Sequence, residues 1–171
     1  MNKSQINPMP DYFDRYINLA ADDDVLRALE ISKEELEAFP IERWEKIGDK
    51  VYAEGKWTIK QIFQHMVDTE RIFAYRALCF ARGEAIKLPS FDENSYADNA
   101  YVNHRTLAEI IEEFKIVKLA TLALYRSFTD EILLKVGVAS SSSYSTLAAG
   151  FIIAGHQRWH LNVIEERYSS I

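Results

Sequence analysis

Apolar residues recur with a helical period along three long stretches of this chain. The stretches run from Ile59 to Ala81, from Leu107 to Tyr125 and from Leu147 to Ile164. In the first two, apolar positions are spaced three and four residues apart, as in an amphipathic helix, and the third is largely apolar. The period-two alternation typical of strands is almost absent. The pattern therefore predicts an all-α fold built on long helices.

The N-terminal region has shorter helical patterns. Asp11 to Ala20 predicts a leading helix, and Val25 to Leu29 a helical turn or two after an acidic break. Ser32 and Glu35 then have the spacing of a capping box, in which side chains satisfy the free backbone N–H groups of a helix start. We therefore expect a separate helical segment from Ser32 to Phe39.

Polar signals also mark the ends of the long helices. Thr58 with Gln61 and Thr106 with Glu109 have capping-box spacing and predict two helix starts. Gly83 is expected to end the first long helix, because glycine adopts the backbone conformation that terminates helices.

Two connections affect the predicted topology. Glu84 to His104 is a long polar and aromatic crossover, and its aromatic content favours an ordered cover. The run Ser140 to Ser143 lacks a G-x-S-x-G motif, so we interpret it as a loop leading to a helix cap at Ser145 or Thr146. The predicted fold is an all-α four-helix bundle with a long crossover connection, not a simple up-down-up-down array.

The histidines carry the candidate chemistry. His156 and His160 are four residues apart, so they share one helical face and their imidazoles can bind one metal ion. His65 lies in an earlier helix and can supply a third nitrogen, whereas His104 precedes a helix and is given no ligand role. A single histidine is more simply a hydrogen-bonded residue, but two imidazoles on one buried stripe are costly unless their nitrogens are satisfied. Spacing alone leaves both interpretations open.

Neighbouring residues exclude two metal chemistries. A zincin protease needs glutamate directly after the first histidine of the pair, and Gln157 occupies that position. A carboxylate-bridged di-iron bundle needs glutamate three residues before its histidines, yet Ile62 precedes His65 and Ile153 precedes His156. The single cysteine, Cys79, has no partner for a Cys-x-x-Cys site, so any metal would be bound by nitrogen, with carboxylate oxygen as a possible addition.

Length, charge and cysteine count narrow the possible classes of protein further. The chain has 171 residues, 48% of them hydrophobic, which fits one domain over residues 1–171. With 20 basic and 26 acidic residues and no basic stripe, nucleic-acid binding is disfavoured. No apolar run reaches the roughly 18 residues that cross a membrane. Because Cys79 is the single cysteine and no signal peptide is evident, we expect a cytoplasmic protein.

Three separated motifs resemble the DinB/YfiT-like superfamily. They are W-T-I-K-Q-I-F-Q-H-M-V-D-T-E-R from Trp57 to Arg71, F-D-E-N-S-Y from Phe91 to Tyr96, and A-G-H-Q-R-W-H-L-N-V-I-E-E-R-Y from Ala154 to Tyr168. The resemblance extends from about Tyr12 to Tyr168.

The resemblance implies a four-helix bundle with an unusual crossover, frequent homodimerisation, and a divalent metal bound by His65, His156 and His160. Zinc and nickel are the leading metals, and iron and manganese also accept imidazole. Members often have a further histidine beside the last ligand, where this chain has Trp159.

Activities in this superfamily differ. Relatives include thiol transferases and isomerases that use low-molecular-weight thiols such as bacillithiol or mycothiol, and metal-dependent hydrolases. The leading hypothesis is a metal-dependent enzyme, a transferase or a hydrolase, in which the metal activates a thiol or water to act on a small molecule. The alternative is a non-catalytic, metal-stabilised dimeric module for binding or stress response.

Several other residues are candidates for supporting roles at the site. Asp68, three residues after His65, can accept the second N–H of a ligand imidazole or pair with Arg71. On the crossover, Asp92, Glu93 and Tyr96 can border the pocket as acid, base or substrate contact, although Asp92 can equally cap a turn. Three arginines of the His65 helix can hold a substrate carboxylate: Arg71, Arg76 and Arg82.

Overall fold

Four long helices form the framework of the protein. The computed structural model describes residues 1–171, and its long helices are α2 (Val25–Glu37), α4 (Ile59–Ala81), α6 (Leu107–Arg126) and α8 (Thr146–Arg167). The shorter elements are η1 (Lys3–Gln5), α1 (Asp14–Ile17), α3 (Ile41–Glu45), α5 (Glu93–Asn99), η2 (Val102–His104), α7 (Asp130–Leu133), β1 (Val136–Ala139) and β2 (Ser142–Ser145). No helix is both long enough and apolar enough to cross a membrane. The predicted helical bundle is confirmed.

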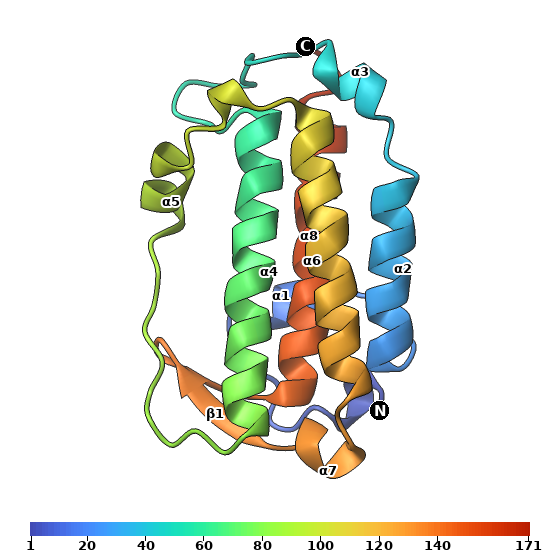
Figure 1. The fold of residues 1–171 in the computed structure, drawn as a ribbon, viewed down its shortest axis with the longest axis vertical. Helices are drawn as coiled ribbons and strands as arrows, with labels where there is room; N and C mark the ends of the chain where they lie inside the picture. Colours follow the sequence, from blue (N-terminus) through green and yellow to red (C-terminus); the bar gives the residue numbers. More distant parts are fainter.

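The crossover gives the bundle its order. Helix α4 packs against α8 and α6, and α2 packs against the same two helices from the opposite corner. In Figure 1, α2 and α8 run upward while α4 and α6 run downward. Two consecutive helices can run the same way because residues 84–104, which contain α5 and η2, return along the full length of the bundle. The prediction of a topology other than up-down-up-down is confirmed.

Side-chain caps define the helix starts. The predicted capping boxes are present at Thr58 and Thr106, each with its hydroxyl accepting from the backbone N–H three residues later. Ser145 caps α8 in the same way, accepting from the N–H of Ala148 at 3.1 Å. Gly83 follows the end of α4 with a φ of +80°, as expected. Each cap satisfies a backbone group that the helix itself leaves free.

Two N-terminal predictions are wrong. Helix α2 is continuous from Val25 to Glu37 and is capped by Asp24, whose carboxylate accepts from two backbone N–H groups of the first turn. Ser32 caps nothing, because it is buried within α2 and its hydroxyl donates to the Leu29 carbonyl at 2.8 Å. The leading helix is reduced to the single turn α1.

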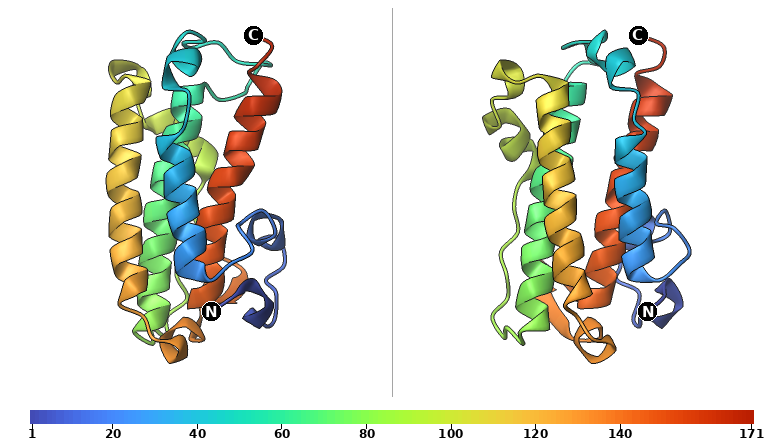
Figure 2. Two further views of the ribbon diagram at one scale, coloured as in Figure 1. Left: turned by 90° about the vertical axis from the view of Figure 1, so that its right-hand side faces the viewer. Right: turned by 45° about the vertical axis from the view of Figure 1, so that its right-hand side comes forward.

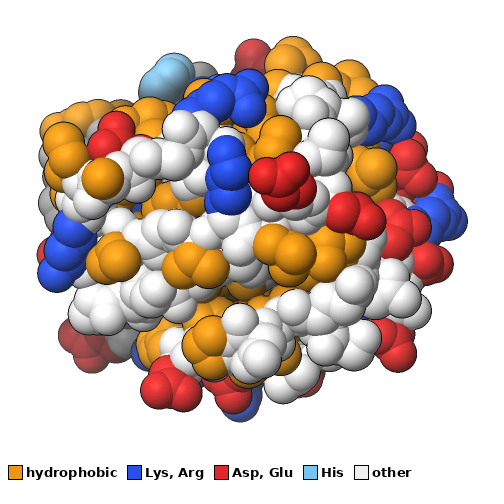
Figure 3. Space-filling view, turned by 90° about the horizontal axis from the view of Figure 1, so that it is seen from below, with side chains coloured by type: hydrophobic (Ala, Val, Ile, Leu, Met, Phe, Trp, Pro, Cys, Tyr) orange, Lys and Arg blue, Asp and Glu red, His pale blue; other side chains and the backbone are white.

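The serine run forms a hairpin instead of an unstructured loop. Strands β1 and β2 are antiparallel, and Ser140 takes a φ of +57° at the turn between them. Leu88 of the crossover pairs with β1, donating to Val138 at 2.9 Å and accepting from Ser140 at 2.9 Å. The hairpin therefore fixes the crossover to the lower end of the bundle. Figure 3 views that end, where apolar side chains and charges of both signs are interspersed.

Two apolar clusters fill the bundle, one toward the hairpin and one toward α3. Along α8, for example, Ala154 belongs to the lower cluster and Leu161 to the upper. The buried residues between the clusters are polar on all four long helices: Ser32 of α2, Thr69 and Glu70 of α4, Lys118 and Thr121 of α6, and His156 and Gln157 of α8. A polar layer thus crosses the middle of the apolar core.

Candidate metal centre

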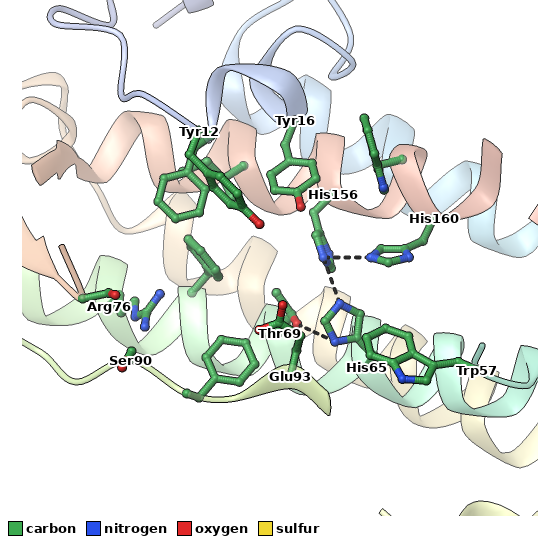
Figure 4. A pocket seen from close by; sticks show the side chains of 16 residues that line it. Tyr12, Tyr16, Trp57, His65, Thr69, Arg76, Ser90, Glu93, His156 and His160 are labelled. Atoms are coloured by element: carbon green, nitrogen blue, oxygen red, sulfur yellow. Dashed lines mark hydrogen bonds between the residues drawn. The ribbon is translucent and has the colours of Figure 1, made fainter. Parts of the chain in front are cut away.

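His156 of the polar layer forms a cluster of three histidines with His65 of α4 and His160 of α8. The Nε2 atom of His156 lies 3.1 Å from Nε2 of His65 and 3.1 Å from Nε2 of His160. One ligand nitrogen from each ring can be chosen so that all three lie within 4.8 Å of one another. Nitrogen ligands about 2.1 Å from a tetrahedral ion are separated by roughly 3.4 Å, so this spacing is close to that of a metal site. Figure 4 shows the rings converging from α4 and α8.

Burial keeps these imidazoles neutral. It lowers the pKa of His65 to about 4 and, with a smaller contribution from His65, the pKa of His160 to about 3. Burial also lowers the pKa of His156 well below its ordinary value, with further lowering by the two neighbouring histidines. Metal ions bind neutral imidazole, so three neutral nitrogens directed at one point fit a divalent metal ion.

The residue that contacts the second ring nitrogen of His65 is not the one considered from the sequence. Thr69, one turn beyond His65 on α4, places its hydroxyl oxygen 3.5 Å from His65 Nδ1. Asp68 instead accepts from the Gln64 amide at 3.0 Å and lies 3.8 Å from Arg71. Adjacent helical residues point about 100° apart, so Thr69 faces the histidines and Asp68 does not. The structure thus places Thr69, which the sequence did not single out, where Asp68 was expected.

A cavity of about 230 Å³ opens beside the histidines. Its walls are mainly aromatic, and besides the histidines and Thr69 they include Tyr12, Phe13, Tyr16, Trp57, Phe73, Phe91 and Trp159. Trp57 lies against two of the rings, with centroids 4.8 Å from His65 and 6.4 Å from His160. Such a space suits a small molecule with apolar surface.

The three crossover candidates have different environments. Glu93, in the first turn of α5, lines the cavity. Asp92 caps α5, accepting from Asn94 and Ser95, and does not line the cavity. Tyr96 lines a separate surface groove and is 48% exposed. The structure therefore brings only Glu93 of the three to the histidines' cavity.

The N-terminal segment supplies a wall that the sequence did not predict. In Figure 2 this segment lies against the outer side of α8. A Cβ atom on Gly155 would lie 1.7 Å from the backbone oxygen of Tyr16, so α1 packs directly on a gap in α8. This contact places the Tyr16 ring 5.1 Å from His156 and 5.7 Å from Trp159. Burial, followed by the neighbouring Tyr12, raises the pKa of Tyr16, so its hydroxyl stays protonated.

The three candidate arginines also differ in their environments. Arg71 is exposed and bonds Glu113 at 2.6 Å, and Arg82 is the exposed residue that follows the helix. Arg76 is 4% exposed and lines the cavity. Only Arg76 therefore remains a candidate for contact with a bound molecule.

Fold and site together define a class: a four-helix-bundle protein whose buried three-histidine cluster fits a divalent metal ion. The chain belongs to the DinB superfamily, whose family model matches residues 19–164.

A solved structure shows the same fold. It is that of YfiT from Bacillus subtilis, described as a probable metal-dependent hydrolase with an unusual four-helix bundle topology. The TM-score is 0.69 at 16% sequence identity, and the similarity covers 99% of this chain and 89% of YfiT. A comparison with curated protein sequences gave no match.

Proposed function

We propose that this protein is a divalent-metal-dependent hydrolase of a small molecule. The observation that carries the proposal is the position of the histidine cluster in the wall of an accessible aromatic cavity, with a single carboxylate, Glu93, lining that cavity. A purely structural metal site would have no need of a ligand-sized space beside it. The description of YfiT as a probable metal-dependent hydrolase supports the same activity.

Each residue has a role in this proposal. His65, His156 and His160 would hold the ion, which when bound lowers the pKa of water to about 7. Thr69 orients the His65 ring through Nδ1, and Glu93 accepts the proton of the attacking nucleophile. Trp57, with Tyr16 on the opposite wall, excludes bulk water and contacts the apolar part of the substrate. The chemical identity of the ion, with zinc and nickel as first choices, belongs to the proposal.

The test is hydrolysis of a panel of esters, lactones and amides by zinc-loaded and nickel-loaded protein. Glu93→Gln should retain the metal but lose about 100-fold or more in kcat, because a positioned general base contributes that much. His160→Ala should lose both metal and activity. Asp98→Asn is the matched control, since Asp98 is an exposed residue of the same helix outside the cavity.

Other outcomes would replace the proposal. Turnover only when a low-molecular-weight thiol is supplied, with thiol consumed, would make the protein a thiol S-transferase. A fully metal-loaded protein that is silent across both panels would favour the non-catalytic binding module. Homodimerisation stays a prediction, and sedimentation of the metal-loaded protein would test it.

A further inference from the structure

Arg76 is a buried cation without an anionic partner. It is 4% exposed, yet none of the ion pairs of the protein includes it. Its one hydrogen bond is donated to the Pro89 carbonyl at 2.9 Å. A guanidinium has five N–H donors, so most of them are free. Lys118, the other fully buried cation, has its carboxylate partner at 2.7 Å.

The surroundings of Arg76 favour a flat anionic group. The guanidinium lies 4.9 Å from the Phe73 ring centroid and 5.9 Å from that of Phe91, and these aromatic rings limit contact with water. The buried hydroxyl of Tyr144 has no hydrogen-bond partner. Burial raises the pKa of Tyr144 to about 12, and the nearby Arg76 charge opposes that rise. The Tyr144 hydroxyl thus lies close to the Arg76 guanidinium but does not itself line the cavity, and a protonated hydroxyl does not balance the Arg76 charge.

The helix sets the distance between Arg76 and the histidines. Arg76 is eleven residues after His65, which brings it back to the same face of α4 about 16 Å along the axis. Thr69 and Phe73 occupy the turns between them, and all four residues line one cavity. Figure 4 shows Arg76 at one end of this cavity and the histidines at the other.

We propose that Arg76 binds the carboxylate of an elongated, largely apolar substrate whose reactive group lies at the histidine cluster. This proposal rests on the proposed function and specifies its substrate class. A guanidinium and a carboxylate match in a planar, two-bond geometry, and one cation is balanced by one negative charge. Ser90 lines the same end and offers a hydroxyl to the same group. The apolar middle of the substrate would contact Phe73 and Phe91.

A structural role for Arg76 is the competing explanation, because its bond to Pro89 fixes the crossover to α4. That role gives no preference between a carboxylic acid and its neutral amide. The test is therefore calorimetric binding of phenylbutyrate and phenylbutyramide to metal-depleted protein, in which an acid cannot bind to a metal ion. The wild type should bind the acid about tenfold or more tightly than the amide.

Variants assign that preference to one residue. Arg76→Gln should remove it and Arg76→Lys should reduce it, because lysine keeps the charge but not the fork. Arg71→Gln, on the exposed side of the same helix, should leave it unchanged. If Arg76→Gln fails to fold, comparing the acid preference of the wild type with that of Arg76→Lys still tests whether Arg76 binds the carboxylate.

Several results would overturn the proposal: equal affinity of the wild type for acid and amide, an acid preference that survives in Arg76→Gln, or an acid preference that appears only after zinc is added. Tighter binding of phenylpropyl phosphate than of phenylbutyrate would overturn the carboxylate assignment. Failure of the hydrolase proposal would look different. Metal binding or turnover would then be missing, while the acid preference of metal-depleted protein would remain.

Discussion

The two sides of the polar layer share helix α4 but serve different purposes. On one side is the histidine cluster, and on the other is the core ion pair of Glu70 and Lys118. The core ion pair is buried: Lys118 bonds Glu70 Oε2 at 2.7 Å and Ser32 at 3.1 Å, and the Lys118 and Glu70 side chains are 1% and 3% exposed. The other Glu70 oxygen, Oε1, has no hydrogen-bond partner. The histidine cluster borders an accessible cavity and has no carboxylate bonded to its rings.

Adjacent residues separate the two sides. On α4, Thr69 faces the histidines, whereas the next residue, Glu70, faces Lys118. On α8, His156 belongs to the histidine cluster, whereas the next residue, Gln157, faces α2. Gln157 donates to the Ser32 carbonyl at 2.6 Å and so ties α8 to α2. A cation paired with a buried carboxylate is neutralised within the protein, whereas neutral imidazole nitrogens that meet only one another and a hydroxyl beside a cavity are available to a ligand.

Breaking the core ion pair should have the largest effect on stability. Lys118→Met leaves the Glu70 carboxylate buried without a cation, which should lower the free energy of unfolding by about 3–5 kcal/mol. Urea denaturation of the metal-depleted protein measures this change. Lys115→Met, which removes a surface ion pair of the same helix, should change it by less than about 1 kcal/mol. Similar losses in the two variants would contradict the distinction.

Adding a side chain at Gly155 should affect the cavity beside the histidine cluster and leave the core ion pair unchanged. The added methyl of Gly155→Ala would collide with the Tyr16 backbone, so α1 must move at a cost of about 1–3 kcal/mol. Metal content should persist while turnover falls, because the displaced segment forms the cavity wall. Thermal unfolding and metal analysis test this together. Stabilisation by about 1 kcal/mol, the helix-propensity gain of alanine, would show that no collision occurs.

Acidification should weaken the metal-free protein through its histidines. The folded pKa of His65 is about 4 against an ordinary 6.5, so between these values the unfolded chain binds more protons. The free energy of unfolding therefore falls as the pH falls below 6.5. From pH 7 to pH 5, urea denaturation should show a loss about 2 kcal/mol larger in wild type than in His65→Gln. Parallel pH profiles would mean that His65 is not held neutral.

The smallest expected effect concerns the contact to His65. Thr69→Ala removes the hydroxyl at Nδ1 and should weaken zinc binding by roughly tenfold, as is typical when an orienting partner of a ligand is lost. Asp68→Asn should leave zinc affinity unchanged, because Asp68 bonds Gln64 and not a histidine. Competition with a chelating dye measures both affinities, and the reverse order would restore the role predicted for Asp68.

Periodic sequence patterns predicted the long helices of the bundle. The features that these patterns missed depend on contacts between residues that are distant in the sequence. Capping pairs such as Thr58 with Gln61 place helix starts because cap and partner are near neighbours in sequence. Ser32 has the same local spacing but is held inside α2 by the distant Lys118. The hairpin likewise depends on pairing with Leu88, and the Tyr16 wall on the missing side chain of Gly155. The glycine next to His156 was the available signal, but a glycine in a helix does not identify what packs against it.

Metal content per chain tests the central claim most directly. Tag-free wild type, His156→Ala and His104→Ala would be loaded with zinc or nickel, washed and analysed by mass spectrometry. His104 is exposed and lies outside the cluster, so it controls for loss of a surface histidine. We expect about one ion per chain in wild type and His104→Ala and none in His156→Ala. A wild type that binds no metal, or a His156→Ala variant that binds as much, would contradict the account.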